Sequence, residues 1–356
     1  MRTIAFYLPQ FFPTKENDEW WEPGFTEWTN VVRATPLYKG HYQPRIPRDL
    51  SFYDLRVPET RKKQAFLAQK AGIEGFCYWH YWFGNGKRLL DRVFREVVES
   101  GQPNYPFCLC WANHSWYKKT WDPTKPNTLL IEQTYPGVED YIAHFNEMLP
   151  AFKDHRYMKV DGRLIFGIFA PLDIPNVSEF IETWNLLAKE NGLSGFYFFA
   201  LSRYEEWLDK LKELPYDAIV LDTLPLLFWQ HHHTIKGKLL SKMAKMKLAT
   251  YRMDYDYYKN KTIDYFNTHC DYTPCIIPDF DHSPRSAKAG IILHGSTPEK
   301  FADLTLKIKS YVESHSKTRD LLFIKAWNEW GEGNYLEPDS KWKSEYLEYL
   351  GKILNK

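Results

Sequence analysis

The sequence predicts an α/β fold in which strands and helices alternate and close into a (β/α)8 TIM barrel. Short apolar segments rich in β-branched and aromatic residues alternate along the chain with longer segments of helical spacing and flanking charges. The long connections all follow predicted strands, as expected of loops at the C-terminal face of a barrel. No internal repeat or linker divides the chain. We therefore expect one catalytic barrel domain over residues 1–356.

Eight segments are predicted to be strands because each is a short apolar run. They are residues 4–9, 75–81, 107–112, 164–169, 195–201, 218–222, 275–279 and 322–327. Eight longer segments are predicted to be helices, over residues 58–71, 87–100, 138–152, 177–191, 203–213, about 252–268, 298–314 and 342–354. Local residues support several boundaries: Thr297 and Pro298 are typical of a helix start, and Gly72 and Gly192 of a helix end.

An open, doubly wound parallel sheet is the alternative architecture, because it also alternates strands with helices. Such sheets usually bind nucleotides through a glycine-rich turn after the first strand. Neither a GxGxxG pattern nor a Walker pattern follows the first strand here. The sequence therefore favours the barrel.

Composition narrows the function classes. The 46 basic and 45 acidic residues give a formal charge of +1, which argues against a general nucleic-acid binder. The five cysteines show no CxxC spacing, so we expect reduced cysteines, no metal and no cofactor. No apolar run approaches the roughly 20 residues that span a bilayer. The N-terminal residues do not resemble a signal peptide, so a cytoplasmic location is expected.

Polar and aromatic side chains recur where the predicted strands end, which is where barrel enzymes place their active sites. Aromatic residues make up 17% of the chain, and aromatic faces stack on sugar rings. Packing against the barrel rim explains any single tryptophan equally well. The substrate-contact candidates are Tyr7, Gln10, Trp28, Tyr78, His80, Trp111, Asn113, Asp279, Trp327, Asn328 and Trp330.

Two glutamates after the last predicted strand are the catalytic candidates. Glu329 and Glu332 are three residues apart, so in a helical turn they share one face, and Gly331 and Gly333 favour a turn. Carboxyl groups about 5 to 5.5 Å apart suit a retaining glycosidase, and about 6.5 to 9.5 Å an inverting one. Retention is favoured, and mutual repulsion would keep one acid protonated as the general acid. The alternative is a pair of loop acids held by arginine or by backbone donors.

A lysine-rich segment over residues 236–247 interleaves five lysines with leucine, methionine and alanine. A solvated helix is one interpretation. The other is a peripheral contact with an anionic membrane or with a diphosphate-linked substrate. The preceding His231, His232 and His233 are consecutive, so their side chains do not converge on one metal in a helix or strand.

Four segments resemble the WbsX family of bacterial polysaccharide and O-antigen gene clusters. They are residues 4–11, 24–28, 75–82 and 327–338, and the similarity extends from the first strand to the last helix. That family is named a glycosyltransferase but is similar to glycoside hydrolase family 99, the endo-α-mannosidases, which are (β/α)8 barrels. Their Asn-Glu-Trp-x-Glu-Gly pattern is matched from Asn328 to Gly333.

The resemblance implies roles for both glutamates. Glu329 resembles the base that deprotonates the sugar 2-hydroxyl and so gives a 1,2-anhydro intermediate. Glu332 resembles the acid/base that protonates the leaving oxygen and then activates water. The expected substrate is a surface-polysaccharide glycan, either an oligosaccharide or a lipid-linked saccharide, and the expected enzyme is a retaining glycosidase or transglycosidase. A sugar-nucleotide-dependent glycosyltransferase is the alternative, with Asp254–Asp256 or Asp279–Asp281 as its aspartate pair.

Overall fold

The computed structural model describes residues 1–119, 125–246 and 248–355. The chain forms two compact units. The first contains residues 1–74 and 222–356, and the second contains residues 75–221. Among the described residues, no helix has both the length and the apolar character that crossing a bilayer requires.

The strand order confirms the predicted (β/α)8 barrel. The sheet follows the order β3-β2-β1-β13-β11-β9-β8-β7, and β3 also pairs with β7, which closes the sheet. A two-residue strand, β6 (Lys159–Val160), extends it by antiparallel pairing with β7. The eight barrel strands are β1 (Arg2–Tyr7), β2 (Gly75–His80), β3 (Phe107–Trp111), β7 (Arg163–Ile168), β8 (Phe196–Ser202), β9 (Ala218–Asp222), β11 (Thr273–Ile276) and β13 (Leu321–Ile324).

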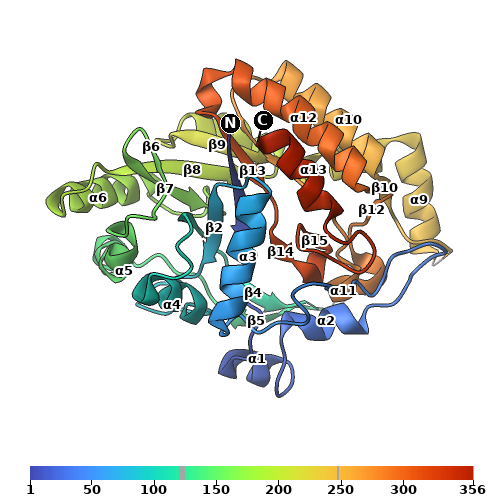
Figure 1. Ribbon diagram of the computed structural model, residues 1–356, viewed down its shortest axis with the longest axis horizontal. Coiled ribbons are helices and arrows are strands. Elements are labelled where there is room, and N and C mark those ends of the chain that lie inside the picture. The colour runs from blue at the N-terminus through green and yellow to red at the C-terminus, as the bar shows by residue number, and fades with distance from the viewer. Residues whose placement is uncertain (120–124, 247, 356) are drawn as a thin grey trace. The chain divides into compact units, whose positions relative to one another are not determined.

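In the first unit, β13 lies between β1 and β11 and pairs with both in parallel. These strands are apolar because a barrel strand is covered on both faces; Ile4, Phe6 and Phe323 are fully buried. Helix α12 (Pro298–Ser314) packs against α10 (Tyr255–Thr268) and α13 (Glu345–Leu354), and the three run side by side in Figure 1. Helix α3 (Pro58–Lys70) packs on α13.

In the second unit, β2, β3, β7 and β8 pair in parallel in that order, and β9 pairs with β8. Its helices are α4 (Arg92–Ser100), α5 (Val138–Phe152), α6 (Val177–Glu190) and α7 (Leu208–Lys212). Much of the aromatic excess fills this core: Trp184 packs on Phe152, Phe166 and Phe196 with ring centroids 4.8 to 5.6 Å apart. Those rings serve packing rather than ligand contact.

All eight predicted strands and all eight predicted helices are present within a few residues of their expected bounds. Each long connection contains structure of its own. The first carries α1 (Lys15–Trp20) and α2 (Glu27–Arg33), the second carries the pair β4 (Trp116–Lys118) and β5 (Thr128–Ile131), and the third carries α8 (Thr223–His233) and α9 (Ile235–Lys245). The other short elements are α11 (Ser283–Ser286), β10 (Met253–Asp254), β12 (Leu293–His294), β14 (Asn328–Glu329) and β15 (Asn334–Tyr335).

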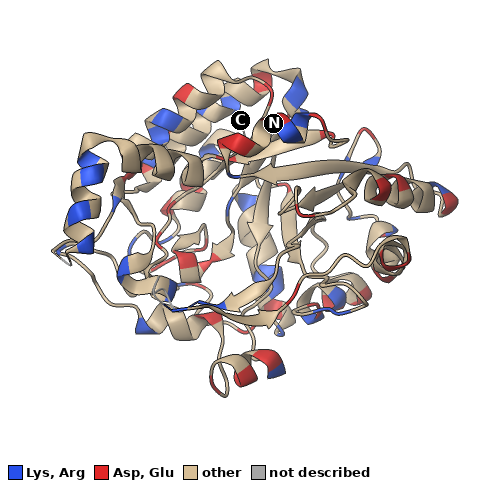
Figure 2. Cartoon of the chain, turned by 180° about the vertical axis from the view of Figure 1, so that it is seen from behind, with Lys and Arg blue, Asp and Glu red and all other residues tan. Residues whose placement is uncertain are grey.

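Charge is unevenly distributed over the helices of the first unit. Basic and acidic side chains alternate along α10 and α12, whereas the charged side chains of α9 are all basic (Figure 2). Alternation of opposite charges is typical of a solvated helix face. The uniformly positive charge of α9 therefore distinguishes this helix from α10 and α12.

Candidate active site

The two candidate glutamates lie in a tight hairpin after β13. Strand β14 pairs antiparallel with β15, so that Glu329 is opposite Asn334, and a 3₁₀ turn over Trp330–Glu332 joins them. Gly333 has a φ of 56°, a left-handed conformation that favours glycine. The predicted turn is present, and it brings both carboxyl groups to one side of the hairpin.

The two carboxyl groups are within hydrogen-bonding reach of each other, so the charge of each affects the pKa of the other. Burial, followed by the charge of Glu332, raises the pKa of Glu329 well above its usual value. Burial also opposes ionisation of Glu332, but the Arg285 charge, with smaller contributions from Lys325 and His282, outweighs it and lowers that pKa to about 2. Of the two carboxyl groups, Glu329 therefore favours the protonated form and Glu332 the ionised form.

Arg285 connects Glu332 to a third acid. Its Nη1 donates to Glu332 Oε1 at 2.6 Å, and its Nε donates to Glu27 Oε2 at 3.0 Å. The side chains of Arg285, Glu332 and Glu27 are 22%, 16% and 13% exposed, so solvent reaches this ion-pair network only slightly. The alternative expectation, acids held by an arginine, is therefore met by Glu332 but not by Glu329.

Gly331 makes room for this ion pair. A Cβ at this position would lie 2.2 Å from Glu27 Oε2 and 2.9 Å from Arg285 Nε, both shorter than any normal contact. Helix α2, α11 and the 3₁₀ turn all meet around it. The absence of a side chain at residue 331 thus allows the glutamate and the guanidinium to close over the turn.

We expect Gly331→Ala to displace Glu27 and Arg285 and to reduce turnover about tenfold, because overpacking a close contact forces its partners to move. The measurement is steady-state turnover on the substrate identified for the wild-type protein. Gly351→Ala in α13 is the matched control, because the nearest atom to its added Cβ is 3.4 Å away. Equal turnover of both variants and the wild type would contradict a fixed Glu27–Arg285–Glu332 geometry.

A second buried ion pair supports the carboxyl-terminal side of the turn. Arg45 Nη1 donates to Asp279 Oδ2 at 2.7 Å and to the Gly333 carbonyl at 3.1 Å. A Cβ on Gly333 would lie 2.9 Å from the Arg45 guanidinium carbon. Asp279, a predicted substrate contact, is therefore paired with an arginine in the ligand-free protein, while its side chain stays 14% exposed.

Asp281 anchors the turn through its backbone. Its N–H donates to the Glu332 carbonyl at 2.6 Å, and its Oδ2 accepts from His41 Nε2 and Gln43 Nε2, each at 2.7 Å. Burial opposes ionisation of Asp281, but the His41 hydrogen bond and the Arg45 charge outweigh it, so the pKa of Asp281 lies below its usual value. An ionised Asp281 thus fixes the position of the Glu332 backbone.

Glu337 organises the aromatic wall behind the pair. It is 2% exposed and accepts hydrogen bonds from Trp330 Nε1 at 2.6 Å, Tyr53 hydroxyl at 2.8 Å and Gln64 Nε2 at 2.6 Å. Burial raises the pKa of Glu337 to about 7, although these donors oppose the shift. The acid therefore positions Trp330, one of the predicted sugar-contact tryptophans.

This raised pKa predicts a pH-dependent stability. The folded state favours protonated Glu337. The stabilisation that this group contributes to the folded state is therefore complete below its ordinary pKa of 4.5 and is lost as pH rises through about 7. We expect a loss of about 3 kcal/mol of unfolding free energy over this range. Urea unfolding of wild type and Glu337→Gln at several pH values measures it, with exposed Glu313→Gln as control. Parallel pH curves for wild type and Glu337→Gln would contradict the assignment.

The other predicted contacts of the first unit are mostly buried. Tyr7 donates its hydroxyl to Gln64 Oε1, and Trp28 donates Nε1 to the Tyr53 carbonyl. The Asn328 amide bonds to both backbone groups of Leu8. Trp28, Trp327 and Trp330 are 8%, 0% and 0% exposed, and Gln10 is partly exposed. These residues build the wall and base of the candidate site, and their contact with a substrate stays a prediction.

The four remaining candidates, Tyr78, His80, Trp111 and Asn113, lie in the second unit. His80 Nε2 is 2.7 Å from His144 Nε2, Trp111 Nε1 donates to the Trp82 carbonyl, and the Asn113 amide bonds to both backbone groups of Ala170. Tyr78 is 2% exposed. Each of these side chains therefore has a structural partner, and their contact with a sugar stays a prediction.

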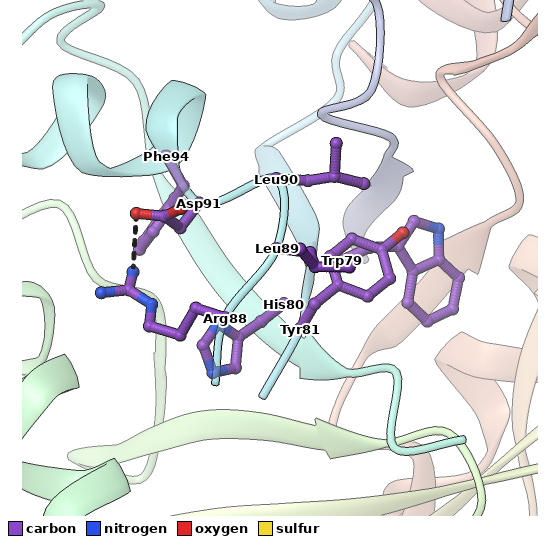
Figure 3. A pocket seen from close by; sticks show the side chains of 8 residues that line it. All are labelled: Trp79, His80, Tyr81, Arg88, Leu89, Leu90, Asp91 and Phe94. Carbon is purple, nitrogen blue, oxygen red and sulfur yellow. Dashed lines mark ion pairs between the residues drawn. The ribbon is translucent and has the colours of Figure 1, made fainter. Parts of the chain in front are cut away.

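A small pocket in this unit is shown in Figure 3. His80, Tyr81 and Arg88 are among the residues that line it, and the Arg88 side chain pairs with Asp91. Burial lowers the pKa of His80 to about 3, so His80 is neutral at physiological pH. A neutral imidazole donates one hydrogen bond through its N–H and accepts one at its other nitrogen.

The aspartates considered as metal ligands are paired with cations or with neutral donors. Asp254 pairs with Lys236, Asp256 with Lys300, and Asp279 with Arg45. His231, His232 and His233 contact three separate partners: Tyr251, Ser241 and the Trp229 carbonyl. Within residues 1–119, 125–246 and 248–355, no three His, Cys, Asp or Glu side chains are grouped as a metal site.

Sequence reasoning missed Arg285, Glu337 and the Glu27 ion pair. Glu27 and Glu337 lie inside segments that carry the family resemblance, so their position in those segments was an available signal. Arg285 lies in the four-residue helix α11, which has no periodic or compositional signal in the sequence. Its role follows only from the fold, which brings it to Glu332, 47 residues away, and to Glu27, 258 residues away.

Comparison with known proteins places this geometry in context. The profile of the family described as Glycosyltransferase WbsX matches residues 3–350. Two curated proteins from strains of Xanthomonas campestris pv. campestris, both named uncharacterized protein WxcX, are 33% identical over 358 residues. The alignment covers 99% of this chain and 49% of each relative, so the chain spans about half the length of those relatives.

Solved structures share the fold. A glycoside hydrolase-like protein matches with a TM-score of 0.63 at 13% identity and covers 99% of this chain and 93% of its own. The GH99 endo-alpha-mannosidase of Bacteroides thetaiotaomicron matches with a TM-score of 0.57 at 14% identity and covers 99% and 96%. At such identities the likeness shows a common barrel architecture.

Proposed function

This chain belongs to the WbsX glycosyltransferase family and has a glycoside-hydrolase-like barrel, and from this premise we propose that it is a retaining glycosidase or transglycosidase. Its proposed substrate is a bacterial surface-polysaccharide glycan. The observation that carries the proposal is the Glu329–Glu332 pair, two largely buried carboxyl groups within hydrogen-bonding reach of each other after a barrel strand. Retention follows because two hydrogen-bonded carboxyl groups leave no room for the water that inverting enzymes place between theirs.

A proton must pass from Glu329 to Glu332 before the chemical step. The roles implied by the family resemblance need an ionised Glu329 and a protonated Glu332, whereas the pKa shifts of the two groups favour the reverse arrangement. A bound sugar supplies the bias. A 2-hydroxyl donating to Glu329 favours its ionised form, and a glycosidic oxygen that accepts from Glu332 favours its protonated form. The shared hydrogen bond is the path along which the proton crosses.

The proposed reaction is then balanced in two steps. Glu329 takes the 2-hydroxyl proton as that oxygen bonds to the anomeric carbon, and Glu332 gives its proton to the leaving oxygen as the glycosidic bond breaks. In the second step Glu332 deprotonates water or an acceptor hydroxyl, which opens the anhydro ring, and Glu329 returns its proton to the sugar oxygen. Two displacements at one carbon give net retention.

A sugar-nucleotide-dependent glycosyltransferase is the second candidate, and the name of the matched family favours it. Its diphosphate would need a cation. The aspartate pairs that would hold a metal are already bonded to Lys236, Lys300, Arg45 and His41. A metal-dependent nucleotide reaction would therefore require these contacts to rearrange, whereas the glutamate pair needs only a substrate.

The deciding experiment incubates the purified protein with surface-glycan oligosaccharides, with and without a panel of sugar nucleotides, and reads the products by mass spectrometry. Shortened or rearranged glycans without any sugar nucleotide are the expected result. Extension that depends on a sugar nucleotide would instead identify the glycosyltransferase. The Glu332→Gln variant, run in parallel, shows whether the product depends on the proposed site.

A further inference from the structure

Helices α8 and α9 form a hairpin whose function the candidate site does not explain. Only Thr234 separates them, and its hydroxyl accepts a hydrogen bond from the Gly237 N–H at 3.0 Å, which caps α9. A Cβ on Gly237 would lie 1.9 Å from the His231 carbonyl oxygen. The glycine therefore lets α9 fold back closely on the end of α8.

Helix α9 packs almost none of its own side chains. Gly237 is its only buried residue, whereas Ile235, Leu239 and Met246 at the following cap are 91%, 59% and 60% exposed. At about 100° per residue, these three side chains lie within about 40° of one another. They form an apolar ridge, and this ridge faces away from Gly237, which contacts α8.

Lysines flank the apolar ridge. By the same helical spacing, Lys238, Lys242 and Lys245 lie along one side and Lys236 lies on the other. Lys236 pairs with Asp254, whereas no ion pair of Lys238, Lys242 or Lys245 occurs among the contacts of the described residues. No aspartate or glutamate occurs from Thr223 to Met253. Figure 2 shows this as a helix with blue segments and no red ones.

Two further large apolar side chains extend the surface. Trp229 on α8 is 63% exposed, and Leu248 after α9 is 68% exposed. Lys247, the last lysine of the predicted basic stretch, lies outside the described residues. A solvated helix places its polar residues outward and its apolar residues inward. Here the apolar residues point outward, so the solvated-helix interpretation does not explain the hairpin.

We propose that the α8–α9 hairpin docks on the surface of a membrane that contains anionic phospholipids. An exposed apolar ridge bordered by lysines is the pattern of helices that lie in the plane of a bilayer interface. The ridge would enter the acyl boundary, and the lysines would pair with headgroup phosphates. The complete lack of acidic residues in this stretch provides the charge complementarity.

The hairpin is connected to the candidate active site within the same unit. Just after α9, the Arg252 guanidinium lies over the Tyr38 ring at 4.4 Å, and Tyr38 stacks on His41 at 4.5 Å. His41 in turn bonds Asp281, which holds the Glu332 backbone. A membrane contact at the hairpin would therefore place a glycan attached to a membrane lipid near the unit that carries the glutamate pair.

Vesicle co-sedimentation tests this inference without requiring activity. The full chain is mixed with phosphatidylcholine vesicles with and without phosphatidylglycerol, at low and high salt. We expect binding only to the anionic vesicles, weakened by salt. We expect the triple variant Lys238→Glu/Lys242→Glu/Lys245→Glu and the double variant Ile235→Asn/Leu239→Asn each to bind at least tenfold more weakly.

The matched control reverses three exposed lysines on another helix of the same unit, Lys62→Glu/Lys63→Glu/Lys70→Glu on α3. This variant changes the net charge as much as the α9 triple variant does. If binding is specific to the hairpin, the α3 variant binds anionic vesicles nearly as well as the wild type. Equal loss in both triple variants, or no binding to anionic vesicles at low salt, would overturn the proposal. Self-association of the chain that Leu239→Asn abolishes would also overturn it, because the hairpin would then bind a second copy. Binding of inorganic phosphate without any binding to vesicles would overturn it as well. Circular dichroism verifies that each variant is folded.

Discussion

We expect Glu332→Gln to lower turnover on a natural glycan by about a thousandfold, because a positioned general acid contributes about 10² to 10⁴ in rate. The amide keeps the size of the side chain but cannot protonate the leaving oxygen. On an aryl glycoside whose leaving group needs no proton, the same variant retains far more of its first-step rate. The measurement is a comparison of pre-steady-state rates on both substrates.

Glu329→Gln is the informative partner variant. It removes the base for the sugar 2-hydroxyl, so we expect a similar loss on both substrates. Glu313→Gln on the exposed face of α12 serves as the control and keeps wild-type rates. Full turnover in both active-site variants would contradict a catalytic role for the pair. If Glu329→Gln and Glu332→Gln lost the same fraction of their rate on each substrate, the proposed division of roles between the two glutamates would be contradicted.

The second large effect concerns pH. Arg285→Met removes the neighbouring cation that holds the pKa of Glu332 at about 2 against burial. Without it, burial raises that pKa above its ordinary value of 4.5, so the pair becomes doubly protonated in mildly acidic solution. Because a doubly protonated pair has no base, we expect kcat/KM of the variant to fall below about pH 5, where the wild type stays active.

Arg285→Lys and Glu27→Gln separate charge from packing in this experiment. The lysine variant keeps the cation and should restore most of the acid-side activity, although it cannot pair with both glutamates in the same geometry. Glu27→Gln keeps Arg285 and the shape of the contact. On the acidic side of the pH profile, its kcat/KM should therefore remain near that of the wild type. An unchanged pH profile in Arg285→Met would show that Arg285 does not control the proton on the pair.

The barrel was predictable because its elements follow local rules. Each of the eight barrel strands is largely an apolar run, and a helix such as α12 combines helical spacing with the capping Thr297 and with Pro298 at its start. Apart from a helix in the lysine-rich segment, the elements in the long connections were not predicted. Helix α1, for example, buries no residue, so it shows no inward apolar stripe that sequence periodicity detects.

The candidate site was predictable only in part. Glu329 and Glu332 follow an apolar strand at a spacing and with glycines that indicate a turn, and the turn is present. Their electrostatics depend on Arg285 and Glu27, which are distant in sequence and meet the turn only in the folded chain. For the same reason, the sequence alone indicated that one acid stays protonated but not which one.

The most direct test of the account is the stereochemistry of the first product. Proton NMR of the anomeric signal, recorded from the start of the reaction with no sugar nucleotide present, distinguishes retention from inversion before mutarotation. A hydrogen-bonded carboxyl pair predicts a retained product that is absent with Glu332→Gln. An inverted first product, or a product formed only after a sugar nucleotide is added, would contradict the central claim.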